Sequence, residues 1–170
     1  MNAVLPLLLV LLAGPDEAAT RPQPGDPARE FSLPASTGKT IKLADYLGKN
    51  TVVLAFFPKA FTGGCTKEMS GLRDSHDQFA GAEAKIFGVS MDNVETQGKF
   101  ADSLKLPFPL LADPDGKVVR AYGVYNDAGY ANRVTFVIGK DGKVAKVIEG
   151  KDAIDPSLTL GACRPATGTH

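Results

Sequence analysis

Cys65 is the residue best placed for covalent chemistry, because an apolar strand is expected to give way to a helix at this point. Residues 51–57, TVVLAFF, predict a buried strand. Pro58 has no amide hydrogen and is expected to end that strand. From about Cys65 onward, apolar residues recur at helical spacing, namely Met69, Leu72 and Phe79. The sulfur is therefore expected in the first turn of a helix that follows a strand end.

This position favours a reactive sulfur. The first turn of a helix has unpaired amide hydrogens and a partial positive charge, which stabilise the nucleophilic thiolate. Gly63 and Gly64 have no side chains, so substrate can approach closely. The hydroxyl of Thr62 and the amides of Gly64 and Cys65 are candidate donors to an oxygen that becomes negative during reaction. Thr62 is also suited to cap the helix, and Pro58 to shield the sulfur from water.

Cys163 is the second of two cysteines in the 170 residues. Two cysteines are too few for a disulfide scaffold, so a disulfide between them would be redox-active rather than structural. Cys163 lies in the segment Leu160–His170, whose small residues predict a flexible tail. It could resolve an oxidised Cys65 within the chain or across a dimer. Alternatively, an external thiol resolves Cys65 and Cys163 is a tail thiol without that role.

Other chemistries find little support in the composition. His76 lies 11 residues beyond Cys65, about 16 Å along a helix, too far to serve as its general base. With His170 as the second histidine, no zinc site is predicted. No glycine pattern of a nucleotide-binding loop follows a strand. Lysine plus arginine equals aspartate plus glutamate at 19 each, so no nucleic-acid partner is predicted. We expect no cofactor and no metal.

The surrounding elements predict an α/β fold. Helices are expected at residues 44–48, 93–104 and 117–122, with Asp92 as a candidate cap for the second. Strands are expected at residues 28–33, 40–43, 84–91, 108–111, 133–138 and 143–149. The first two strands form a hairpin and the last pair is antiparallel, so the central sheet is expected to be mixed, with flanking helices. Ligands in such sheets bind beyond the carboxyl ends of strands. Cys65 comes shortly after the carboxyl end of the strand expected at residues 51–57.

The N-terminus predicts a leader. Ala3–Gly14 is apolar but too short to span a bilayer as a helix, and its length suits the core of a secretory signal. Met1 and Asn2 supply no positive charge, and no clean cleavage pattern follows. We expect export to the periplasm, with a cytoplasmic location as the alternative. Pro15–Pro27 is expected to be a linker. The predicted division is residues 1–24 leader and linker, 25–160 domain and 161–170 tail.

The loop around Cys65 resembles that of the peroxiredoxins. Pro58, Thr62 and Cys65 match their pattern P-x-x-x-(T/S)-x-x-C, and FFPKAFTGGCT…GLRD is most similar to the bacterioferritin-comigratory, or Q-type, branch. The resemblance covers roughly Gly25–Gly150. It implies a thioredoxin fold with an N-terminal hairpin. It also implies a peroxidase that reduces hydrogen peroxide or organic hydroperoxides through a cysteine sulfenic acid, recycled by thioredoxin or another thiol. Dimers and decamers are common in the family, and a homodimer is one expected assembly.

The resemblance also gives roles to charged residues. The string RVTFVIGKDGK, from Arg133, is similar to the family's second arginine site, which implies a guanidinium near Cys65 that stabilises the thiolate and holds peroxide. The alternative is a solvated surface charge. Glu68 shares the helix face of Cys65, and glutamate there orients the arginine in some peroxiredoxins; a solvent-facing residue is the alternative. Ser70 occupies the position where many Q-type members carry a resolving cysteine, so that local route is absent.

Three rival functions remain at this point. An exported thioredoxin-like disulfide reductase needs a C-x-x-C pair, and Glu68 occupies the second cysteine position. A copper-chaperone relative needs C-x-x-x-C, where this chain has Met69. A redox sensor that keeps the fold without fast turnover has no distinguishing residue pattern.

Overall fold

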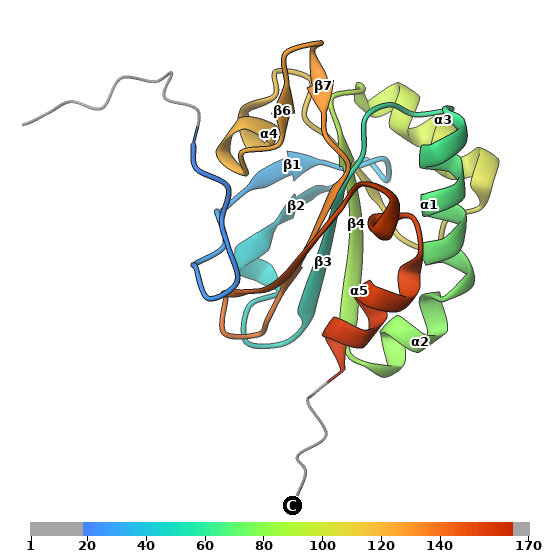
Figure 1. The fold of residues 1–170 in the computed structure, drawn as a ribbon. Coiled ribbons are helices and arrows are strands. Elements are labelled where there is room, and N and C mark those ends of the chain that lie inside the picture. The colour runs from blue at the N-terminus through green and yellow to red at the C-terminus, as the bar shows by residue number, and fades with distance from the viewer. Residues whose placement is uncertain (1–18, 165–170) are drawn as a thin grey trace, which may run out of the picture.

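The computed structural model describes residues 19–164, which are built around a five-stranded mixed sheet of order β5-β4-β3-β8-β9 (Figure 1). The strands are β3 (Thr51–Phe56), β4 (Ala84–Ser90), β5 (Leu110–Ala112), β8 (Val134–Ile138) and β9 (Val144–Glu149). β3 pairs parallel to β4 and antiparallel to β8, so the predicted mixed sheet is confirmed. β3 lies at the centre, and its carboxyl end leads directly into the loop before Cys65.

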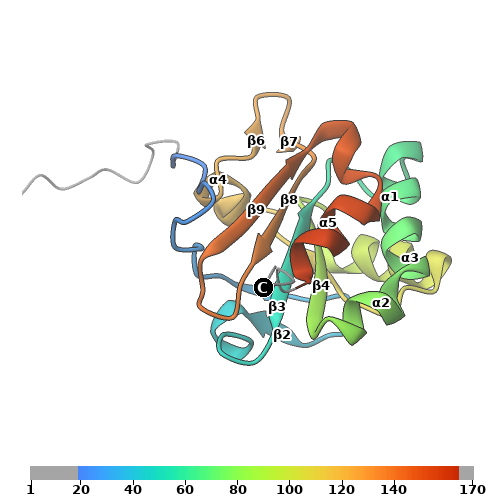
Figure 2. The same cartoon turned by 60° about the horizontal axis from the view of Figure 1, so that its bottom comes forward.

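Helices cover one face of the sheet, and a smaller set of elements covers the other (Figures 1 and 2). The first face carries α1 (Gly63–Asp74), α2 (His76–Gly81), α3 (Val94–Leu104) and α5 (Pro156–Cys163). The second carries α4 (Lys117–Ala121) and the hairpin of β1 (Ser32–Pro34) and β2 (Thr40–Lys42). Alternate side chains of β3 enter the two cores, because successive residues of a strand point to opposite faces.

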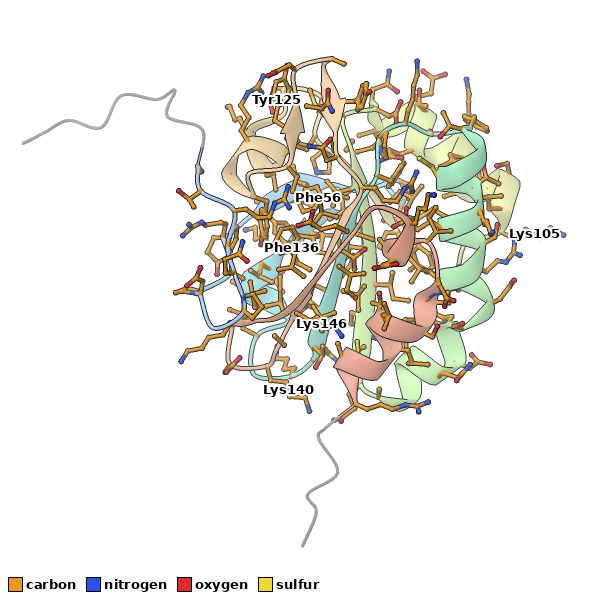
Figure 3. The ribbon with its side chains drawn as sticks, viewed as in Figure 1. Phe56, Lys105, Tyr125, Phe136, Lys140 and Lys146 are labelled. Carbon is orange, nitrogen blue, oxygen red and sulfur yellow. The ribbon has the colours of Figure 1, made fainter. Side chains whose placement is uncertain are left out.

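The two cores hold the sheet rigid beneath the loop. On the face with α4, the rings of Phe56 and Phe136 pack edge to face, with their centroids 5.8 Å apart. Figure 3 labels both residues in the interior of the molecule. Tyr122 packs against both rings, at 5.2 Å from Phe56 and 5.0 Å from Phe136. Such pairs stabilise the core beyond their buried area. Phe56 is the last residue of β3, so this cluster fixes the strand end that precedes the site.

Several local predictions differ from the structure. The helix that begins near Cys65 breaks at Ser75 into α1 and α2. Asn93, not Asp92, caps α3, because its side chain accepts a hydrogen bond from the Thr96 amide at 2.8 Å. Short elements that the sequence did not predict complete the fold. They are the hairpin of β6 (Tyr125–Asn126) and β7 (Tyr130–Ala131), and the 3-10 turn η2 (Gly150–Ala153); the turn expected at residues 44–48 is η1 (Leu43–Asp45).

The ends of the chain also differ from prediction. The described part of the expected linker packs on the domain: Arg21 forms an ion pair with Glu149, and the Gly25 amide donates to the Val144 carbonyl at 2.8 Å. At the other end, α5 runs through Cys163, so the prediction of a flexible tail from residue 161 is wrong for its first residues. The signal-like segment Ala3–Gly14 and the last six residues lie outside the described residues, and export stays a prediction. No helix within residues 19–164 has the length and apolarity needed to cross a membrane.

Candidate active site

The loop between β3 and α1 is a tight turn that presents Thr62 at the start of the helix. Phe57 extends the pairing with β4, because its amide donates to the Val89 carbonyl at 2.9 Å. The Thr62 hydroxyl donates to the Lys59 carbonyl at 2.8 Å and closes the turn. Thr62 occupies the N-cap position in an extended conformation, but its side chain turns back into the loop. The predicted side-chain cap is therefore wrong, although the predicted position at the helix start is right.

Cys65 is the third residue of α1, which begins two residues earlier than the sequence indicated. The first helical hydrogen bond runs from the Thr66 amide to the Thr62 carbonyl at 2.9 Å. The amides of Gly63, Gly64 and Cys65 precede it, and the first amides of a helix have no acceptor within it. They supply a concentrated positive end of the helix dipole beside the sulfur.

Arg133 reaches the sulfur from the neighbouring strand. It directly precedes β8, whose Val134 pairs with Phe56 at the end of β3. The antiparallel register therefore brings Arg133 to the same end of the sheet as the loop. Its Nη2 lies 3.3 Å from Cys65 Sγ, and its Nη1 forms an ion pair with the Glu68 carboxylate. The Arg133 side chain is 14% exposed. The alternative of a solvated surface arginine is therefore wrong.

Glu68 is a fully buried carboxyl that faces Arg133. Burial raises the pKa of Glu68 to about 7, although the charge of Arg133 and its hydrogen bond act in the opposite direction. Burial by itself lowers the pKa of the Arg133 guanidinium. Glu68 and Cys65 together outweigh this effect and hold that pKa above its usual value. The predicted alternative of a solvent-facing glutamate is wrong. Glu68 and Cys65 share one face of α1, and Arg133, just before β8, bridges them.

Cys65 is buried, but its surroundings are not purely apolar. Its exposed fraction is 0%, and it packs with Met69 and Phe57 in the core between the sheet and the helices α1, α2, α3 and α5. A guanidinium and a helix start nevertheless face the sulfur, and these are the groups that activate a cysteine. Pro58 is half-buried where the loop begins, and its expected role in shielding the sulfur from water stays a prediction.

The chain was compared with models of known protein families. Residues 24–147 match the model of the AhpC/TSA family. The chain belongs to this family, the peroxiredoxins. Peroxiredoxins are thiol peroxidases, so the protein is an oxidoreductase that acts on peroxides with thiol reductants. The rival assignments to a disulfide reductase or a copper-chaperone relative are excluded by this membership.

Relatives of this peroxiredoxin cover most of its length. Peroxiredoxin Bcp of Bacillus subtilis is 41% identical over 129 residues, covering 72% of this chain and 82% of the relative. Peroxiredoxin Bcp of Escherichia coli is 36% identical over 132 residues, with 74% and 84% covered. The crystal structure of peroxidoxin BcpB from Mycobacterium tuberculosis has 36% identity and a TM-score of 0.81, covering 87% and 100%. The bacterioferritin comigratory protein of Xanthomonas campestris, with reported alkyl peroxide reduction activity, has 30% identity and a TM-score of 0.72, covering 78% and 89%. These similarities confirm the thioredoxin-like fold and the predicted Q-type resemblance.

Cys163 lies far from Cys65 in this peroxiredoxin. α5 begins beside Gly71, in the second half of α1, and its far end lies beside α2 (Figure 1). Cys163 is the last residue of α5, so it sits toward the opposite end of the sheet from the first turn of α1. It is 6% exposed, and burial raises the pKa of its thiol to about 12. A disulfide needs Cα atoms within about 7 Å, so pairing with Cys65 in one folded chain requires local unfolding. Resolution across a homodimer stays a prediction.

Sequence reasoning missed the polar groups that hold the active-site loop. The Asp92 carboxylate accepts a hydrogen bond from the Ala60 amide at 2.9 Å, and the Ser90 hydroxyl donates to the same carboxylate at 2.6 Å. Ser90 is the last residue of β4, and Asp92 follows two positions later. β4 runs parallel to β3, so these residues lie beside the end of β3. Polar residues at neighbouring carboxyl ends of parallel strands are a recognisable signal of a shared site. Within residues 19–164, no cluster of three potential metal-ligating side chains is present.

Proposed function

We propose that Cys65 is the nucleophile of this thiol peroxidase. The observation that carries the proposal is the 3.3 Å contact between Arg133 Nη2 and Cys65 Sγ in the first turn of α1. A guanidinium and unpaired helix amides both stabilise a thiolate, and the thiolate is the form of cysteine that attacks. Cys163 has neither group as a described partner and is buried with a raised pKa.

The reaction is a two-electron oxidation of sulfur. The thiolate of Cys65 attacks the terminal oxygen of hydrogen peroxide or an organic hydroperoxide, and an S–O bond forms as the O–O bond breaks. The sulfur becomes a sulfenic acid. The other oxygen departs as hydroxide or alkoxide and takes a proton to become water or alcohol. The alkyl peroxide reduction activity of the Xanthomonas campestris relative supports organic hydroperoxides as substrates.

The surrounding groups act on the two peroxide oxygens. Arg133 and the amides of Gly64 and Cys65 are donors suited to the oxygen that gains negative charge. The Thr62 hydroxyl already donates its hydrogen to the Lys59 carbonyl, so its free lone pairs can accept a hydrogen bond from the peroxide O–H. This assignment replaces the donor role that the sequence suggested for Thr62. Pro58 covers the approach, and Glu68 positions Arg133 without touching substrate.

An external thiol completes the cycle in this proposal. A reductant such as thioredoxin attacks the sulfenic sulfur of Cys65, which releases water and forms a mixed disulfide. A second thiol of the reductant then releases the Cys65 thiol. The buried position of Cys163 at the end of α5 supports this route over resolution within the folded chain.

Peptide mass mapping tests the proposal after one equivalent of hydrogen peroxide without reductant. The proposal predicts a sulfenic acid on Cys65, detected as the adduct of a sulfenic-acid reagent, beside a free Cys163 thiol. A Cys65–Cys163 disulfide would overturn the external route. Oxidation of Cys163 with Cys65 unchanged would overturn the choice of nucleophile.

A further inference from the structure

We propose that Asp92 is a positioning residue for the peroxidase reaction, because it fixes the loop that precedes Cys65. The inference rests on the proposed role of Cys65 and adds a residue 27 positions further along the chain. Asp92 follows the end of β4, and its Oδ2 accepts the Ala60 amide at 2.9 Å. Ala60 lies in the middle of the turn between β3 and α1 and is 5% exposed. Its amide therefore depends on the Asp92 carboxylate for a hydrogen-bond acceptor away from solvent.

The Asp92 carboxylate is itself held by a directed chain of hydrogen bonds. The Ser90 hydroxyl donates to Oδ2 at 2.6 Å and accepts from Gln97 Nε2 at 3.0 Å. Gln97 Nε2 also donates to the Leu111 carbonyl at 2.7 Å. Ser90 and Gln97 are both fully buried. These hydrogen bonds link β5, α3 and β4 to the loop. Buried networks of this kind hold a functional group in one orientation.

The loop needs such a support because its backbone is strained at Phe61. Phe61 has a φ of +63°, in the left-handed region that an aromatic residue rarely adopts. A residue in that conformation persists only where its surroundings hold it. The Ala60 amide is fixed by Asp92 immediately before it, and the Phe61 ring packs 5.1 Å from that of Phe100 after it.

Loss of the Asp92 acceptor therefore acts on the groups that follow Phe61. Thr62 comes next in the chain, and its hydroxyl faces the peroxide in the proposed mechanism. Arg133 directly precedes β8 and contacts the sulfur from that side. Removing the acceptor should displace Thr62, while Arg133 and the helix that begins after Thr62 still stabilise the thiolate. The reaction with peroxide and the general reactivity of the thiol are then separable.

The test compares two second-order rates at Cys65: oxidation by hydrogen peroxide and alkylation by iodoacetamide. Asp92→Ala should slow oxidation roughly 10- to 100-fold while alkylation changes less than about twofold. Asp92→Asn keeps an oxygen acceptor for the Ala60 amide and should restore oxidation to within about threefold of wild type. Asn93→Ala is the matched control, because it removes the cap of α3 next in sequence and leaves the bond to Ala60.

Each other outcome contradicts the proposal. Oxidation by folded Asp92→Ala within about twofold of wild type would show that the loop does not need this acceptor. Parallel loss of alkylation would place the effect on the thiolate, and failure of Asp92→Asn to recover would exclude hydrogen-bond acceptance. If Asp92→Ala does not fold, Ser90→Ala removes the donor that orients the carboxylate and must itself slow oxidation selectively. Cys65→Ser measured alongside tests the nucleophile separately, because peroxide consumption there would reject the proposed function whatever Asp92 does.

Discussion

Gly64 lies directly against the guanidinium of Arg133. A Cβ atom at position 64 would stand 2.9 Å from Nη2 of Arg133, closer than side-chain atoms approach without displacement. The same nitrogen lies 3.3 Å from the sulfur of Cys65. A side chain at position 64 would therefore push the guanidinium away from its present place beside the sulfur.

Gly64→Ala should slow oxidation of Cys65 by peroxide roughly tenfold or more, because the new methyl group displaces Arg133. Gly63→Ala is a matched control one residue earlier, where an added Cβ has no atom within 4 Å. Both changes replace glycine by a better helix former, so neither should lower stability through propensity. Stopped-flow oxidation rates compare the two variants. Equal rates in both would show that the arginine contact does not matter.

The chemistry of the loop was predictable from residues close together in sequence. Pro58, Thr62 and Cys65 lie within eight positions, and the strand and helix around them follow from apolar periodicity. The contact with Arg133 joins residues 68 positions apart, and it followed only from the family resemblance. The sequence predicts Asp92 as a cap for α3, because it directly precedes the helix pattern. Its hydrogen bond with Ala60 forms because β3 and β4 are neighbours in the sheet.

The C-terminal helix shows where composition misleads. Leu160–His170 is rich in small residues, and this favoured a tail. In the structure, Asp155 caps α5 through the Ser157 amide at 2.8 Å, and Pro156 occupies the first turn. These are ordinary signals of a helix start. The helix is stabilised by burying Leu160 and Cys163 against the sheet, which is a tertiary effect that local composition does not report.

Arg133→Lys should slow oxidation of Cys65 by peroxide roughly tenfold or more. Lysine keeps the charge, but a single ammonium cannot bridge Glu68 and the sulfur as the two guanidinium nitrogens do. Stopped-flow oxidation of the two proteins by hydrogen peroxide at one pH measures the difference. An oxidation rate equal to that of wild type would contradict the assigned role of Arg133.

Glu68 should make the protein less stable as the pH rises toward neutrality. Its pKa is raised from 4.5 to about 7, so the folded state keeps a proton that the unfolded chain loses. The stability from this group is full below about pH 4.5 and falls between pH 4.5 and 7, by at most about 1.4 kcal/mol per pH unit.

Urea unfolding of wild type and Glu68→Gln between pH 4.5 and pH 8 measures that dependence. The stability of wild type relative to Glu68→Gln should decline across this range and level off above about pH 7, because the amide does not ionise. Asp113, whose pKa burial raises to about 6, titrates in both proteins, so the difference isolates Glu68. A constant difference at all pH values would exclude a raised pKa for Glu68.

Cys163 should react slowly with thiol reagents while the protein is folded. Its side chain is buried, and its pKa of about 12 leaves almost no thiolate at neutral pH. In Cys65→Ser, labelling by a disulfide reagent should be roughly 100-fold slower in buffer than in denaturing urea. Fast labelling of the folded protein would show that Cys163 is accessible and would restore it as a candidate resolving thiol.

Peroxide consumption by wild type, Cys65→Ser and Cys163→Ser, with thioredoxin and its reductase as the reductant, tests the central claim most directly. The account predicts that Cys65→Ser consumes no peroxide above the background of the reductant, while Cys163→Ser turns over within about twofold of wild type. Turnover by Cys65→Ser at the wild-type rate would contradict the account, because the reacting sulfur would then not be the one beside Arg133.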